Sequence, residues 1–274
     1  MLNNKESEYK LAAVSKRLKE LDNFAVAFSG GVDSTFLLAV SKQVRPRNLI
    51  AITVSSQFVP RKAVESAKRT AKSVKVKHIC LDVDILKNPE IKINSFDRCY
   101  HCKKQLFALI KKTAENLGVC HMLHAVNLDD LGDFRPGLKA AEELNFLAPL
   151  ADAGLTKQEI RYLSRQMGLE TWNKPSQSCL ATRIPYDTII TGEDLAGIEK
   201  AEDMLHDMGF EQVRVRCHGK LARIEVEEAR IRKISEKETR HVISSRFSEI
   251  GFAHTSIDID GYASGKMNTG FKKD

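Results

Sequence analysis

The stretch Phe24-Ala-Val-Ala-Phe-Ser-Gly-Gly-Val-Asp-Ser-Thr-Phe36 joins an apolar run to a glycine pair and then to apolar residues at helical spacing. This pattern predicts a strand, a tight turn and a helix. In that geometry, N–H groups at a helix N-terminus converge on an anion, and paired glycines let the backbone approach it. Ser29 and Ser34 add hydroxyl donors, whereas Asp33 would repel a phosphate unless a cation lay between them. The stretch therefore predicts a site for a magnesium nucleotide.

The segment Ser29-Gly30-Gly31-Val32-Asp33-Ser34 resembles the PP-loop, SGGxDS, of the ATP pyrophosphatases. It lacks the Gly-Lys-Ser/Thr ending of a Walker loop. The resemblance implies that ATP is cut between its α and β phosphates, giving an adenylated substrate and pyrophosphate. It also implies that the loop binds ATP and that Asp33 holds magnesium and pyrophosphate. The alternative interpretation is an ordinary turn between a strand and a helix.

Composition and charge set broad limits. The 274 residues suit one large domain or two modest ones, and a hydrophobic content of 42% is ordinary for a soluble protein. No apolar run is long enough to cross a membrane, and residues 1–6 hold no apolar signal core. We therefore expect a cytoplasmic protein without a membrane partner. The net charge of +7 favours anionic ligands such as ATP, a nucleotide substrate or RNA, without choosing among them.

Strand and helix patterns alternate through the first part of the chain, which predicts an α/β domain over residues 1–171 with a parallel sheet and helices on both faces. Ligands of such sheets bind beyond the carboxyl ends of the strands. The glycine loop, Thr53, Ser55 and Asn127 fall at that edge. The expected strands lie at 24–28, 48–54, 77–82 and 121–126, and the expected helices at 5–21, 60–74, 103–117 and 156–167.

Residues 172–192 contain Pro175, Pro185 and Gly192 and are expected to form a long active-site loop or linker. Residues 193–274 then predict a small α+β domain with an antiparallel sheet, for which we expect roles in substrate binding and oligomerisation. Its expected elements are helices at 193–208 and 229–250 and strands at 211–216, 221–226 and 252–259.

Three of the six cysteines lie among polar neighbours. Cys99 and Cys102 form a CxxC that is expected to open the helix at 103–117, and Cys179 lies alone in the long loop. The helix N-terminus and nearby basic residues should favour thiolates. The pattern leaves three interpretations open: an iron–sulfur cluster on three cysteines with one open iron, a nucleophilic Cys179 with a separate CxxC, or inert thiols.

Several motifs together are similar to the LarE family, the ATP-dependent sulfur transferases of nickel-pincer nucleotide biosynthesis. They are the PP-loop, the CxxC segment 98–103, the acidic segment 127–137, Cys179-Leu-Ala-Thr-Arg183 and Arg214-Val-Arg-Cys-His-Gly219. The resemblance extends over about residues 10–260. Thr182 stands where the family usually has serine, a change that keeps the hydroxyl.

The resemblance implies that ATP adenylates a carboxylate of pyridinium-3,5-biscarboxylic acid mononucleotide and that sulfur then displaces AMP. Some family members sacrifice the cysteine that matches Cys179, whereas others hold a 4Fe–4S cluster on three cysteines. With Cys99 and Cys102 present, this chain resembles the cluster type. The sulfur would come from sulfide, a donor protein or Cys179 itself. The family also suggests a homo-oligomer, of hexameric form.

The same resemblance implies roles for four further side chains. Arg183 is expected to act with Cys179 and Asp33 in catalysis and also to bind substrate. The other expected substrate-binding residues are Glu202, Arg214 and Arg216. Arginine suits phosphate and carboxylate because its planar fork binds them bidentately. The alternative for the arginines is an exposed strand face.

Two other functions remain open. Some tRNA-thiolating enzymes also join a PP-loop to a CxxC and a distant cysteine, but the chain shows no RNA-binding extension or concentrated basic patch, so a nucleic-acid partner is not expected. A non-catalytic sensor of iron–sulfur clusters or nucleotides would bind ATP without releasing pyrophosphate.

Overall fold

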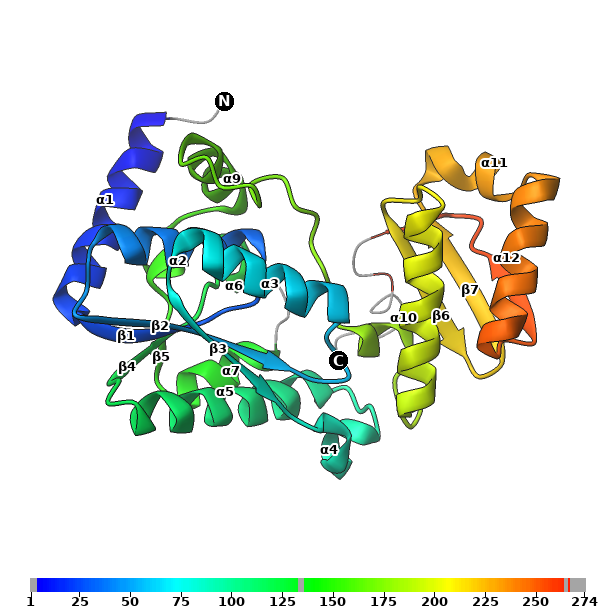
Figure 1. Cartoon of the computed structure of the whole chain (residues 1–274), viewed down its shortest axis with the longest axis horizontal. Helices are drawn as coiled ribbons and strands as arrows, with labels where there is room; N and C mark the ends of the chain where they lie inside the picture. The colour runs from blue at the N-terminus through cyan, green and yellow to red at the C-terminus, as the bar shows by residue number, and fades with distance from the viewer. Residues whose placement is uncertain (1–3, 133–135, 264–265, 267–274) are drawn as a thin grey trace. The chain divides into compact units, whose positions relative to one another are not determined.

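The computed structural model describes residues 4–132, 136–263 and 266, and within them the chain forms two compact units (Figure 1). The first unit is drawn from residues 1–84 and 97–177, and the second from residues 85–96 and 178–274. The sequence placed a linker at 172–192, whereas the structure divides the chain between 177 and 178. It also adds residues 85–96 to the second unit, which no sequence pattern indicated.

A parallel sheet forms the centre of the first unit, with the strand order β3-β2-β1-β4-β5. All of its pairings are parallel, which confirms the expected α/β class. The strands are β1 (Asn23–Ala27), β2 (Asn48–Ser55), β3 (Lys77–Asp82), β4 (His121–Leu123) and β5 (Phe146–Leu147).

Helices cover both faces of this sheet because its central strand is apolar on both sides (Figure 1). Phe24 and Val26 of β1 belong to one buried core, whereas Ala25 points into the other, as alternation along a strand requires. The first core is covered by α1 (Asn4–Leu21), α2 (Val32–Gln43), α3 (Arg61–Val74) and α9 (Lys157–Gln166), and the second by α5 (Arg98–Asn116) and α7 (Pro136–Glu143).

Two helix starts bear on the site. Helix α5 begins at Arg98, five residues before the expected start, so the CxxC lies inside the helix and not ahead of it. Helix α9 begins after a capping box in which Thr156 and Glu159 bond each other's backbone N–H, as the sequence predicted. The short helices of this unit are α6 (Leu128–Leu131) and α8 (Pro149–Asp152).

In the described part of the chain, no helix combines the length and apolarity needed to cross a membrane.

Gly30 lets the loop after β1 pack directly against α3. Its φ of +69° lies in the left-handed region, and a Cβ there would lie 2.7 Å from the Cα of Ala67. The contact atom is backbone, so a side chain could be accommodated only by moving the helix. Gly30 therefore fixes the distance between the loop and α3.

The second unit is built on a sheet with the order β6-β7-β8. Strands β6 and β7 are antiparallel as expected, but β7 and β8 are parallel, so the expectation of an antiparallel sheet is wrong for this pair. The chain between β7 and β8 forms helices, and parallel neighbours need such a crossover. The elements are α4 (Pro89–Lys92), α10 (Gly192–Asp207), β6 (Val213–His218), β7 (Leu221–Val226), α11 (Ile231–Ile234), α12 (Lys237–Ile250) and β8 (His254–Ile257), with 3-10 turns η1 (Ile85–Lys87), η2 (Leu180–Arg183) and η3 (Glu228–Arg230).

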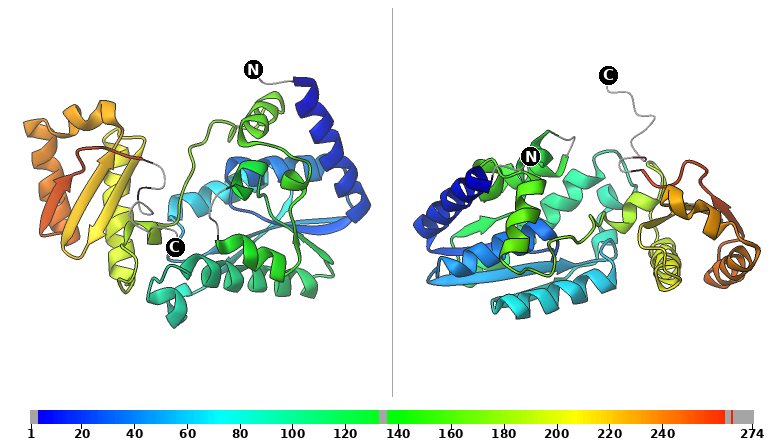
Figure 2. Two further views of the ribbon diagram at one scale, coloured as in Figure 1. Left: turned by 180° about the vertical axis from the view of Figure 1, so that it is seen from behind. Right: turned by 90° about the horizontal axis from the view of Figure 1, so that it is seen from above.

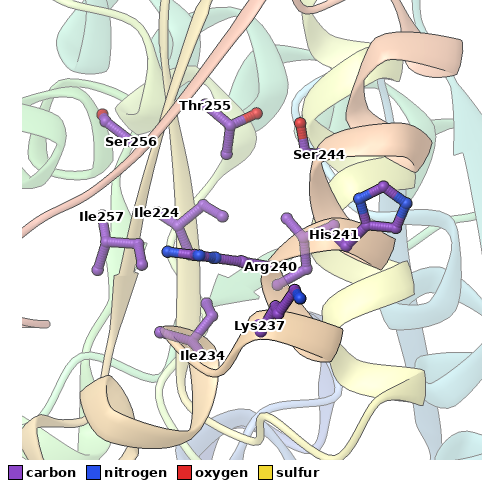
Figure 3. Close-up of a pocket in the computed structure, with 10 residues that line it drawn as sticks. Ile224, Ile234, Lys237, Arg240, His241, Ser244, Thr255, Ser256 and Ile257 are labelled. Atoms are coloured by element: carbon purple, nitrogen blue, oxygen red, sulfur yellow. The ribbon is translucent and has the colours of Figure 1, made fainter.

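Helices α10 and α12 lie on the same face of this small sheet (Figure 2). A pocket of about 510 Å³ opens where α12 meets β7 and β8 (Figure 3). Four isoleucines line it, together with Lys237, Arg240 and His241 of α12. None of the residues expected to act in catalysis or binding lines this pocket.

Replacing Gly30 by alanine should destabilise the protein more than the same change at Gly118. Both glycines have φ near +70°, but a Cβ at Gly118 meets nothing within 4 Å. The backbone strain of about 1–2 kcal/mol is therefore common to both variants. Overpacking against α3 should add roughly 1–3 kcal/mol for Gly30→Ala alone. Urea unfolding measures both, and equal losses would contradict the close packing of loop and helix.

Candidate functional site

The loop between β1 and α2 forms a cradle at the carboxyl edge of the sheet. Helix α2 begins at Val32 after Gly31, and no side chain in the described ranges caps it, so N–H groups of its first turn remain available to a ligand. The hydroxyls of Ser29 and Ser34 lie 3.0 Å apart inside the loop, and Ser29 Oγ accepts from Gly31 N–H. The strand, turn and helix expected from the sequence are therefore present, and the hydroxyls of the loop help to hold its shape.

Asp33 is the charged group of this cradle. One carboxylate oxygen, Oδ2, lies 2.5 Å from the Nζ of Lys157. The other, Oδ1, is buried and has no hydrogen-bond partner among the residues the structure describes. A buried carboxylate oxygen without a donor is the kind of ligand that Mg²⁺ takes. The residues present therefore fit a magnesium ion at Asp33.

Lys157 is the first residue of α9, and a second carboxylate fixes its backbone. Its N–H donates to Oδ2 of Asp129 at 2.8 Å, while Leu128 N–H donates to the carbonyl of Leu155. Sequence reasoning missed this lysine. The capping box at Thr156 was the available signal, because it placed the start of a helix next to the acidic segment.

Lys174 is a second lysine that the sequence did not single out. Its Nζ donates to the carbonyl of Gly30 and to Oγ of Ser66 on α3, both at 3.0 Å. Burial lowers the pKa of this ammonium, and nearby Arg69 lowers it further. Lys174 thus ties the beginning of the expected long loop to the phosphate cradle.

Thr53, Ser55 and Asn127, the remaining residues expected to bind the nucleotide, lie at the same edge of the sheet but differ in burial and in hydrogen-bond partners. Thr53 is buried, and its hydroxyl donates to the Phe28 carbonyl at 2.6 Å. Ser55 ends β2 and is half-buried. Asn127 is buried and caps α6 through its side chain. Thr53 and Asn127 thus hold the ends of strands and helices around the cradle. The acidic segment 127–137 runs through residues 133–135, which lie outside the described residues.

Cys99 and Cys102 occupy the first turns of α5, and both are half-buried and form no disulfide among the described residues. Their spacing of three places them on one side of the helix. The guanidinium of Arg98 donates to Cys99 Sγ at 3.6 Å. Gly137 of α7 lies against the same turn, where its Cβ would meet Lys103 Cγ at 2.7 Å. Among the described residues, no group of three or more His, Cys, Asp or Glu side chains is gathered for a metal ion.

Cys179 belongs to the second unit, where it precedes η2, and its free thiol is half-buried. Arg183 holds this segment, since its Nη1 donates to the carbonyls of Ser178 and Cys179, both at 3.1 Å. Thr182 Oγ1 also donates to the Cys179 carbonyl, at 2.8 Å, which uses the hydroxyl that serine would supply. The backbone of Cys179 is therefore fixed by several hydrogen bonds.

Arg183 is in turn held by a buried carboxylate on α10. Its Nε and Nη2 donate to the two oxygens of Glu202, both at 2.9 Å, and the two side chains are almost fully buried. Glu202 Oε1 also accepts from Val215 N–H of β6. One carboxylate thus connects α10, β6 and the turn that carries Cys179.

Arg214 and Arg216 of β6 are buried, with 7% and 5% of their surface exposed, so the alternative of an exposed strand face is wrong. Arg216 donates to the Thr182 carbonyl and to Glu225, both at 2.7 Å. The guanidinium of Arg214 lies over the ring of Tyr262, 5.2 Å from its centre. Burial, followed by the neighbouring charge of Arg183, lowers the pKa of Arg214.

Comparison with known proteins gives independent evidence for the family to which this chain belongs. The family model of the PP-loop domain matches residues 3–133. The chain is 34% identical to the pyridinium-3,5-bisthiocarboxylic acid mononucleotide synthase of Lactiplantibacillus plantarum, over 94% of each chain. It is 37% identical to an uncharacterized protein of Synechocystis sp., over 95% of this chain and 97% of that protein. A tRNA-specific 2-thiouridylase of Rickettsia felis is 28% identical, over 68% of this chain and 61% of its own length.

Removing one partner of the Arg183–Glu202 pair should destabilise the protein strongly. Arg183→Met leaves Glu202 buried without its counter-charge, which costs about 3–5 kcal/mol of unfolding free energy. The double variant Arg183→Met/Glu202→Leu should recover most of this loss, because both charges are gone. Urea unfolding tests both.

The matched control is Arg246→Met, which breaks an exposed pair with Glu249 and should change stability by less than about 1 kcal/mol. A small loss for Arg183→Met as well would show that the buried pair does not hold the Cys179 turn in place.

Proposed function

We propose, because this chain belongs to the LarE family of PP-loop sulfur transferases, that it replaces a carboxylate oxygen of pyridinium-3,5-biscarboxylic acid mononucleotide with sulfur at the expense of ATP. The single observation that carries the proposal is the cradle around Asp33. Its helix has no side-chain cap among the described residues, and in the first turn of that helix Asp33 keeps a buried carboxylate oxygen without a partner there. That combination suits the phosphates of a magnesium nucleotide.

Adenylation is the first step of the proposed reaction. A carboxylate oxygen of the substrate attacks the α-phosphorus of ATP, the bond between that phosphorus and the bridging oxygen to the β-phosphorus breaks, and pyrophosphate leaves. Loop N–H groups and Ser29 and Ser34 bind the phosphates. Magnesium, held by Asp33, would supply charge that offsets the phosphate oxygens. The loop N–H groups, the serine hydroxyls and the magnesium ion would together stabilise the negative charge that grows on the departing pyrophosphate.

Sulfur transfer is the second step. A sulfur nucleophile attacks the carbonyl carbon of the acyl adenylate, the C–O bond to AMP breaks, and AMP leaves with both electrons of that bond. Adenylation is needed because an oxide is a poor leaving group and AMP is a good one. Two rounds would give the bis-thiocarboxylate.

We propose further that Cys99, Cys102 and Cys179 hold a 4Fe–4S cluster. The support is the chemistry of the donor set: three cysteines that form no disulfide among the described residues, two of them on one helix face with Arg98 beside Cys99. When bound, such a cluster would supply an open iron that can carry a sulfide. The competing proposal is that Cys179 gives up its own sulfur and becomes dehydroalanine.

For the substrate we propose Arg183, Glu202, Arg214 and Arg216. The support is a concentration of buried guanidinium groups within the second unit: Arg183 and Arg216 donate to backbone carbonyls of the Cys179 turn, and Arg214 is buried next to both. A substrate with a phosphate and two carboxylates would be complementary to this charge. A cytoplasmic location and a hexameric homo-oligomer remain predictions from the family resemblance.

Similarity to the tRNA-specific 2-thiouridylase supports tRNA thiolation as a second candidate, although it covers a smaller share of this chain. A nucleotide or cluster sensor is the third. The three differ in product: a thiocarboxylate mononucleotide, a thiolated tRNA, or none.

Anaerobic incubation with ATP, magnesium, sulfide and the dicarboxylate mononucleotide tests the proposal, with the masses of the small-molecule product and of the protein measured together. We expect a mass gain of one sulfur for one oxygen at each carboxylate, and no product with Asp33→Asn. An unchanged protein mass with bound iron supports the cluster, whereas loss of H₂S from Cys179 supports the sacrificial route. Thiolation of added tRNA in place of the mononucleotide would overturn the proposal.

A further inference from the structure

The cation next to Asp33 in this structure is a lysine. Lys157 Nζ lies 2.5 Å from Oδ2, whereas Oδ1 is buried without a partner among the described residues. One carboxylate oxygen of Asp33 is thus paired with a lysine of the protein, and the other oxygen is left for a ligand. Both side chains are partly exposed: 33% of the Lys157 side chain and 21% of the Asp33 side chain are accessible to solvent.

We propose that Lys157 is a phosphate-binding lysine that Asp33 holds until a magnesium nucleotide arrives. The proposal rests on the ATP-dependent function above and adds a residue and an exchange of partners to it. The Asp33 carboxylate would then hold the magnesium ion, and the ammonium of Lys157 moves to the β and γ phosphates of ATP. No covalent bond changes, and each charge keeps an opposite partner throughout.

The surroundings of Lys157 suit such an exchange, because hydrogen bonds fix its backbone, while its side chain is held at its tip by Asp33. Asp129 accepts from its backbone N–H at 2.8 Å, and Thr156 and Glu159 cap the same helix end. The four-carbon stem of the lysine can therefore swing while its Cα stays in place.

The exchange also explains how a carboxylate can belong to a phosphate site. Without a cation, Asp33 would repel ATP, and without Lys157 the nucleotide-free protein would carry an unbalanced carboxylate. The lysine serves both states. It neutralises Asp33 when the cradle holds no nucleotide, and it opposes phosphate charge once magnesium has taken its place.

Equilibrium binding of AMP and of the non-cleavable α,β-methylene analogue of ATP, both with magnesium, tests the proposal. Lys157→Met should weaken the analogue by roughly tenfold to a hundredfold, the loss of one charge-assisted contact. Affinity for AMP should be unchanged, since AMP lacks the β and γ phosphates. Lys157→Arg, which keeps the charge, should recover most of the affinity for the analogue.

Mn²⁺ binding without nucleotide, followed by electron paramagnetic resonance, is the second readout. Mn²⁺ should bind Lys157→Met more tightly than the original protein, because the competing ammonium is gone. Lys10→Met is the matched control: it breaks another lysine ion pair to α9 and should change none of these affinities.

Equal weakening of AMP and the analogue would overturn the proposal, because it would make Lys157 a structural residue. Unchanged affinity for the analogue, or unchanged Mn²⁺ binding, would also overturn it. A protein that shows the predicted pattern but never transfers sulfur would contradict the proposed function and leave the exchange intact. A chain that binds neither AMP nor the analogue would contradict both.

Discussion

A carboxylate among phosphate-binding N–H groups needs a cation, and the first unit is arranged around that need. Asp33 faces Lys157, Lys157 is placed by Asp129, and Asp129 belongs to the segment that follows β4. The same segment continues to Gly137, which packs against the turn bearing Cys99. The carboxyl edge of the parallel sheet thus connects the phosphate cradle to the cysteine pair through one stretch of chain.

The second unit satisfies a comparable constraint with opposite charges. Buried guanidinium groups need buried carboxylates, and Glu202 and Glu225 provide them for Arg183 and Arg216. Because Arg183 also bonds the backbone of Cys179, the ion pair that satisfies the charge also holds the cysteine turn. The Cys179 turn is thereby positioned by packing and hydrogen bonds within the unit.

Short sequence patterns correctly predicted the features that depend on neighbouring residues in the chain. The strand, glycine pair and helix at the cradle, the parallel sheet and the capping box at Thr156 all follow from short-range sequence and were predicted correctly. Lys157 and Lys174 were missed because their partners lie 124 and 144 residues away, at Asp33 and Gly30. The parallel pairing of β7 with β8 depends on how a helical crossover packs, which no strand pattern encodes.

In the proposed reaction, ATP activates a carboxylate of the substrate before sulfur enters. The most direct measurement uses substrate labelled with ¹⁸O in its carboxylates and follows the mass of the AMP released. Adenylation of the carboxylate predicts one ¹⁸O atom in each AMP for each sulfur incorporated, because the C–O bond breaks on the substrate side. Unlabelled AMP, with sulfur incorporated, would contradict the account.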